Sequence, residues 1–147
     1  MRDLPRQLTV DELAGLFEGR TRFVERLAEL DDPLGRARDV AAALPDDEKK
    51  EVLDVHPAVG ARRNLSARSA AEQGADERDQ FDPVELEQLN RQYEERFGFR
   101  FVVFVNRRPK SAIVPVLRER LERTREQELA TALDELCSIA EDRWRRS

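Results

Sequence analysis

Apolar residues recur at intervals of three and four along most of the chain, which is the spacing of amphipathic helices. Polar and charged residues occupy the positions between them, so each helix has one buried face and one exposed face. The pattern predicts helices over residues 9–17, 21–30, 32–44, 45–55, 82–97, 111–123 and 124–145, with a shorter helix ending at residue 73. The loop before that short helix begins at residue 57, and residues 74–81 are predicted to be irregular.

Capping signals mark the ends of several of these helices. Thr9 and Glu12 have the spacing of a capping box. Asp32-Pro33 and Asp82-Pro83 each place a capping side chain before a proline that fits the first helical position. Gly98 follows the apolar stripe of the 82–97 helix, where a left-handed residue ends a helix at little steric cost.

Residues 99–105 (FRFVVFV) are the only stretch rich in β-branched and aromatic residues. A single strand has no neighbour for its hydrogen bonds. We therefore expect an extended, buried segment that passes between helices rather than a sheet. Pro115, in the helix that follows, is tolerable if it falls in the first turn, where backbone N–H groups have no partner in the helix.

Composition agrees with an all-α protein that forms a single domain over residues 1–147. Charged and hydrophobic residues each make up 39% of the chain, so enough apolar side chains exist to build a core. The net charge of −5 and the lack of a basic segment argue against nucleic-acid binding. No apolar run suggests a membrane span or a secretory leader, so a cytoplasmic location is expected.

His56 is the only histidine and the first candidate for acid–base chemistry, because imidazole exchanges a proton near neutral pH. It stands at the predicted end of a helix and before Pro57, which favours extended backbone. Taken alone, it could equally be a histidine stabilised by the helix dipole. With one histidine and one cysteine, Cys137, a structural metal site is not expected, and Cys137 fits the core.

Three further candidates are weak when taken separately. Ser69 to Gln73 places a carboxylate, Glu72, beside an amide, although Ser-x-x-Glu is also a capping box. The ends of the stretch from Phe97 to Val105 could offer backbone groups to a ureido or imidazolone ring, or the stretch could be only a buried connection. Arg143 could bind a carboxylate, or it could be an exposed arginine at a helix end.

Taken in order, these features resemble the family of 2-oxo-4-hydroxy-4-carboxy-5-ureidoimidazoline (OHCU) decarboxylases. The resemblance rests on His56-Pro57, Ser69-x-x-Glu72-Gln73, Leu89-Asn90-x-x-Tyr93, Phe97-Gly98-Phe99, Phe101-Val102-Val103, Arg120-Leu121, Glu128-Leu129, Ala132-Leu133, Ile139 and Arg143. It is good from about residue 52 to 145, whereas the N-terminal third agrees only in its helical periodicity.

The resemblance implies an all-α fold, often as a homodimer, and a decarboxylation that yields S-allantoin without a metal or organic cofactor. It implies catalytic roles for His56 and Glu72, with an imidazolium at His56 kept charged by Glu72 as the expected proton donor. The implied substrate contacts are Pro57, Ser69, Ala70, Ala71, Gln73, Phe101, Val102, Val103, Phe104, Val105 and Arg143.

Departures from the family pattern leave the substrate open. Arg100 stands where the family usually has proline, Arg107-Arg108 replaces a segment that is often Gly-Arg, and residues 74–78 differ from the usual glycine-containing stretch. A new arginine beside the pocket, Arg100 or Arg107, could accommodate a more anionic substrate or point outward. The alternatives are the same fold acting on another small carboxylated ureido or imidazoline compound, and a catalytically silent helical interaction module.

Overall fold

The computed structural model describes residues 4–5, 7–59 and 81–146. Within them the chain forms seven helices and no strand, which confirms the all-α class. The helices are α1 (Val10–Phe17), α2 (Arg22–Ala28), α3 (Pro33–Ala43), α4 (Asp46–Asp54), α6 (Pro83–Phe97), α7 (Lys110–Leu121) and α8 (Arg125–Arg146). The predicted short helix ending at residue 73 lies outside the described residues.

The predicted caps are present in the structure. The Thr9 hydroxyl accepts the backbone N–H of Glu12, and the Glu12 carboxylate accepts the N–H of Thr9. Asp32 and Asp82 accept N–H groups from the first turns of α3 and α6, each of which begins with proline. These side chains satisfy backbone donors that have no partner within the helix, so local sequence fixes where the helices begin.

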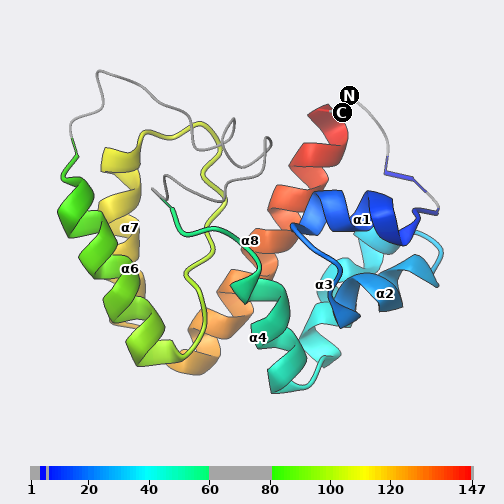
Figure 1. The fold of residues 1–147 in the computed structure, drawn as a ribbon, viewed down its shortest axis with the longest axis horizontal. Helices are drawn as coiled ribbons and strands as arrows, with labels where there is room; N and C mark the ends of the chain where they lie inside the picture. Colours follow the sequence, from blue (N-terminus) through cyan, green and yellow to red (C-terminus); the bar gives the residue numbers. More distant parts are fainter. Residues whose placement is uncertain (1–3, 6, 60–80, 147) are drawn as a thin grey trace.

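Helix α8 is the centre of the fold. It packs against α1, α3 and α4 on one side, while α6 and α7 form a pair on the other side (Figure 1). Leu133, Leu136 and Ile139 on its predicted stripe are buried, and Cys137 is fully buried, as its place on the stripe predicts. Because α8 contributes to both groups of helices, it can carry side chains into the space between them.

The segment after α6 runs through that space (Figure 1). Helix α6 ends at Gly98, whose φ of 80° is the left-handed conformation predicted from its position. Phe99, Phe101 and Val103 beyond it are buried, and the backbone enters no sheet ladder within the described residues. The expectation of a buried, non-helical segment is therefore confirmed.

Helix α7 begins one residue earlier than expected and ends two residues earlier. Pro115 lies in its second turn, so the condition under which the sequence makes it tolerable, a place in the first turn, is not met. The proline removes the donor that would otherwise bond the carbonyl four residues before it. Ile113, Val114 and Leu117 are buried around it, so tertiary packing offsets that loss.

No helix among residues 4–5, 7–59 and 81–146 is long and apolar enough to cross a membrane. The buried apolar residues of these helices belong to one connected core. A single domain over the whole chain stays a prediction, because it also covers residues outside the described part.

Candidate functional site

His56 lies directly after α4, where the sequence predicts it. The helix begins after Pro45 with acidic residues in its first turn, and it ends at Asp54, with Val55 as the capping residue. The His56 backbone N–H then donates to the carbonyl of Leu53 at 3.2 Å. The residue is 4% exposed, and its imidazole Nε2 is buried with no hydrogen-bond partner within the part of the chain described here. A buried polar atom that has no hydrogen-bond partner in these ranges indicates a place where a ligand can bond.

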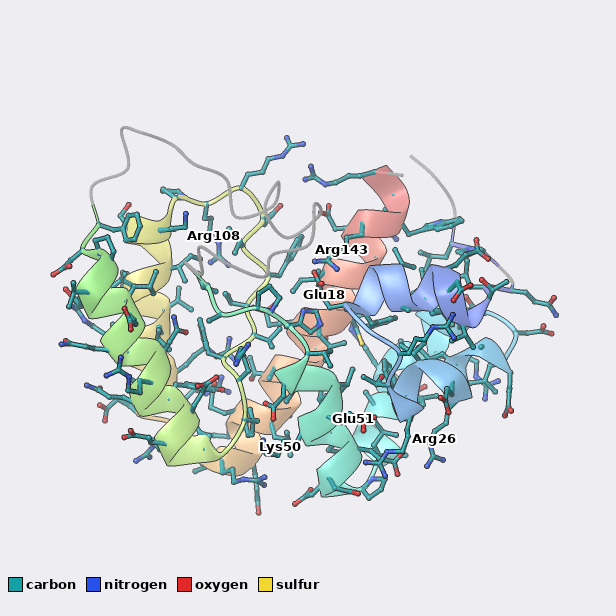
Figure 2. All side chains as sticks on the ribbon, viewed as in Figure 1. Glu18, Arg26, Lys50, Glu51, Arg108 and Arg143 are labelled. Carbon is teal, nitrogen blue, oxygen red and sulfur yellow. The ribbon has the colours of Figure 1, made fainter. Side chains whose placement is uncertain are left out.

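An ion pair from two distant elements lies close to this imidazole. Arg143 comes from α8 and Glu18 from the residue after α1, and Figure 2 shows the two side chains lying together. Arg143 Nη2 donates to Glu18 Oε1 at 2.8 Å, and its Nη1 donates to the Leu16 carbonyl at 3.1 Å. Both side chains are nearly buried, at 3% and 9% exposure. The structure therefore overturns the alternative of an exposed arginine at a helix end.

This environment favours the neutral form of His56. Burial lowers the pKa of the imidazole, and the positive charge of Arg143 lowers it further, to about 4. Glu18 opposes the shift and Arg100 adds to it. Since a group with this pKa is unprotonated at pH 7, the ring is a neutral imidazole there, and its described surroundings oppose protonation. An imidazolium there needs further negative charge close to the ring.

Side chains of α7, of α8 and of the turn before α7 hold one edge of the segment that contains residues 101–105. Arg120 Nη1 donates to the Val102 carbonyl at 2.9 Å, and Arg108 Nη2 donates to the Phe104 carbonyl at 2.6 Å. The Phe104 backbone also hydrogen-bonds to the Glu135 carboxylate. Two alternate positions, 102 and 104, are thus bonded to the protein, as expected where an extended chain turns alternate residues to the same edge.

The backbone groups of Phe101 and Val103, which alternate with residues 102 and 104, differ in their hydrogen bonding. No hydrogen bond to the backbone of Phe101 or Val103 occurs within residues 4–5, 7–59 and 81–146, although both residues are buried. In extended backbone their N–H and C=O groups point away from the edge held by Arg120 and Arg108. This second edge offers both donors and acceptors to a polar ligand.

A buried network fixes Arg120 itself. Its Nε donates to Glu128 Oε1 at 2.7 Å, and the Tyr93 hydroxyl donates to the same oxygen at 2.6 Å. Arg123 donates to the other oxygen, Oε2, at 3.1 Å. Glu128 is fully buried, so these three donors compensate the cost of burying its charge. The network gives the Val102 carbonyl a rigid partner.

The predicted site residues divide into three groups. The structure brings His56 and Arg143 into one neighbourhood, and it buries the 101–105 segment between the helices. Pro57 follows His56 and is half-buried. Ser69, Ala70, Ala71, Glu72 and Gln73 lie outside the described residues, so their predicted roles stay predictions.

Sequence reasoning missed several residues that hold these groups. Glu18 has φ of 70° after a short helix, and no motif distinguishes it from other surface glutamates. Asn90 donates from Nδ2 to the Val59 carbonyl at 3.0 Å and fixes the chain beyond His56. Its place in the Leu89-Asn90-x-x-Tyr93 motif was a signal in the sequence, but that motif gave no role for the side chain. Arg108 bonds two backbone carbonyls, at Phe104 and Val105.

Among the described ranges, no group of three or more His, Cys, Asp or Glu side chains could hold a metal ion. The absence of a metal or organic cofactor stays an expectation from the family resemblance. The groups that are present support acid–base chemistry at His56, attraction of an anion by Arg143, and backbone hydrogen bonding by the 101–105 segment.

Comparison with known proteins agrees with the sequence resemblance. The family model for OHCU decarboxylase matches residues 2–145. The 2-oxo-4-hydroxy-4-carboxy-5-ureidoimidazoline decarboxylase of Haloferax volcanii is 36% identical over 98 residues, which cover 65% of this chain and 58% of that protein. The uric acid degradation bifunctional protein PucL of Bacillus subtilis is 31% identical over 143 residues, which cover 91% of this chain and 29% of that protein. The matches thus span less than two thirds of these relatives.

Two solved structures share the fold. A crystal structure of OHCU decarboxylase in the presence of (S)-allantoin aligns with a TM-score of 0.72 and 22% identity, covering 90% of this chain and 94% of that one. A crystal structure of (S)-allantoin synthase aligns with a TM-score of 0.64 and 24% identity, covering 91% of this chain and 47% of that one. At these identities the likeness shows the helical arrangement, not the chemistry.

Proposed function

The chain belongs to the OHCU decarboxylase family, and from that premise we propose that it converts OHCU to S-allantoin in uric acid degradation. The observation that carries the proposal is the buried imidazole of His56, whose Nε2 has no partner within the described residues and which lies close to Arg143. An acid–base group with a vacant hydrogen-bonding atom, next to a positive charge, suits an anionic substrate that must exchange a proton.

The substrate carries a carboxyl and a hydroxyl group on the same ring carbon. Loss of CO2 breaks the bond to the carboxylate and leaves its electron pair on the ring, delocalised toward the adjacent imine or carbonyl. The product then takes up one proton, and delivery to one face sets the S configuration. Donors aimed at the developing charge lower the barrier, because they are in place before the charge appears.

His56 is the proposed group that moves this proton. In the free protein the ring is neutral at pH 7, because burial and Arg143 lower its pKa to about 4. A bound carboxylate would favour the charged ring, and so would Glu72 if it lies beside His56 as the family resemblance implies. The proton donor is then an imidazolium that forms with the substrate present, rather than one already charged in the empty site.

The remaining groups position the substrate. We assign the edge of the 101–105 segment that carries the backbone of Phe101 and Val103 to the ureido and ring amides, which present donors and acceptors alternately. Arg143 attracts the carboxylate, while Glu18 keeps the guanidinium in place. Pro57, Ser69, Ala70, Ala71 and Gln73 complete the proposed contacts, together with the rest of the 101–105 segment.

The test is to generate OHCU from urate with a urate oxidase and a hydroxyisourate hydrolase, and to follow the optical activity of allantoin. The protein should accelerate formation of the S enantiomer over spontaneous decay. His56→Gln and Glu72→Gln should each lower kcat by about 10²- to 10⁴-fold, the usual contribution of general acid–base catalysis. Arg91→Met, on the exposed face of α6, is the control and should leave the rate unchanged. Failure of the protein to accelerate the reaction would overturn the proposal.

We also propose a homodimer and a cytoplasmic location, on the family resemblance and the composition. Light scattering coupled to size-exclusion chromatography distinguishes a dimer from the 17.0 kDa monomer. Limited proteolysis tests the proposed single domain, because a chain that folds as one unit yields no stable half-length fragment.

A further inference from the structure

Arg100 connects three parts of the protein at the entrance to the 101–105 segment. Its backbone N–H donates to Asp54 Oδ1 at 3.0 Å, on the last residue of α4. Its guanidinium Nη1 donates to the His56 carbonyl at 2.7 Å, and its Nε donates to Glu94 Oε1 of α6 at 2.7 Å. One residue thus joins α6, the end of α4 and the backbone of His56.

The contact between Arg100 and the His56 carbonyl occurs at a peptide bond that has few hydrogen-bonding groups. The His56 carbonyl belongs to the peptide bond with Pro57, and proline has no N–H. That carbonyl is therefore the only hydrogen-bonding group of the peptide, and Arg100 holds it. The His56 N–H is already bonded to the Leu53 carbonyl. Both peptides that flank His56 are held by hydrogen bonds, and the direction of its Cα–Cβ bond is fixed with them.

The sequence alone did not show where the Arg100 side chain lies, and these bonds do. Two of its guanidinium nitrogens are turned to protein oxygens, and the side chain is 31% exposed. These two bonds hold the guanidinium at the backbone of His56 and at Glu94 of α6. Its place is beside the proton-transferring residue, with its charge partly balanced by Glu94.

We propose that Arg100 is a positioning residue that fixes the backbone of His56 and thereby aims its imidazole at the substrate. The inference rests on the proposed function only for the identity of the reaction, since the contact itself is independent of it. Among residues 4–5, 7–59 and 81–146, the charged groups that act on the imidazole are Arg143 of α8, Glu18 after α1, and Arg100 at the start of the segment. Arg100 is the one of the three that is bonded to the His56 backbone.

The experiment uses the fact that His56 is the only histidine, so ring-labelled histidine gives one imidazole NMR signal. Arg100→Met removes the charge and the donors, Arg100→Gln removes the charge and shortens the donor, and Arg100→Lys keeps the charge with a donor of similar reach. Arg91→Met is the matched control, because Arg91 is exposed on α6 and paired only with Glu87 in the same helix. Thermal unfolding followed by circular dichroism verifies that each variant folds.

For Arg100→Met we expect a displaced or broadened His56 signal at pH 8 and kcat lowered by about 10- to 100-fold, with KM changed less than about threefold, since misplacing a catalytic group affects the chemical step. Arg100→Lys should recover more of kcat than Arg100→Gln, and Arg91→Met should match the parent protein. If Arg100→Met does not fold, the lysine and glutamine variants supply the same comparison.

An unchanged His56 signal in folded Arg100 variants would overturn the inference, whether or not kcat falls. A displaced signal in a protein that never accelerates OHCU breakdown would leave the positioning role intact and remove the proposed function. The two proposals therefore fail on different measurements.

Discussion

The lowered pKa of His56 makes protein stability depend on pH in a window that the structure defines. The folded state keeps the ring neutral down to about pH 4, because of burial and the charge of Arg143, whereas the unfolded chain protonates it near its ordinary value of 6.5. Between these values the unfolded state binds more protons, so the free energy of unfolding falls as the pH is lowered from 6.5 toward 4.

The size of the effect follows from the pKa difference. A shift from 6.5 to about 4 is worth about 3 kcal/mol when the pH is below both values. By pH 4.5 roughly 2.5 kcal/mol of that amount should already be lost relative to pH 8. This is a large fraction of the stability of a typical domain, which is about 5–15 kcal/mol.

The assay compares the parent protein with His56→Gln, which cannot titrate at this position. Urea unfolding followed by circular dichroism gives the free energy of unfolding of both proteins at several values between pH 8 and pH 4.5. Titrating carboxylates affect both proteins alike, so the difference between them isolates His56. The parent should lose roughly 2.5 kcal/mol relative to the variant across this range. A difference that stays constant to within about 0.5 kcal/mol would refute the reasoning and indicate that a carboxylate such as Glu72 offsets the burial.

Other predictions concern the buried polar contacts and the caps, with urea unfolding as the measurement for each. Glu18→Gln should cost about 3 kcal/mol, because it removes the carboxylate charge that Arg143 Nη2 bonds in a nearly buried pair; a loss below about 1 kcal/mol would contradict a tightly coupled pair. Glu128→Gln should cost about 3–5 kcal/mol, whereas Tyr93→Phe, which removes one of three donors to that carboxylate, should cost about 1 kcal/mol; equal losses would count against the network. Thr9→Ala should cost about 1 kcal/mol through the lost cap of α1, and no loss would show that packing alone fixes this helix.

The residues that perform the proposed chemistry were easier to predict than the residues that position them. His56 is a single histidine at a helix end, and the ordered motifs around it point to one family. No local motif identifies Glu18, because its role is to bond Arg143, which lies 125 residues further along the chain. Arg100 is recognisable in the sequence as a departure from the family pattern. Its contact with the His56 carbonyl, however, depends on how α4 and α6 pack.

Sequence alone determined the helices, most of their ends, and the buried segment after α6. These features depend on periodicity, on capping side chains and on Gly98, which act over a few residues. Pro115 shows the limit of local rules, because packing around Ile113 and Leu117 stabilises a second-turn proline that the first-turn rule did not expect.

Tertiary structure alone decided the state of the site. Whether His56 is charged depends on burial and on Arg143 from the far end of the chain, neither of which leaves a trace in the sequence around residue 56. Likewise, which edge of the 101–105 segment is already bonded depends on Arg120 and Arg108 reaching it from α7 and from the turn before that helix. Electrostatic fields and hydrogen bonds act through space, and only the packing of the helices around α8 brings these groups together.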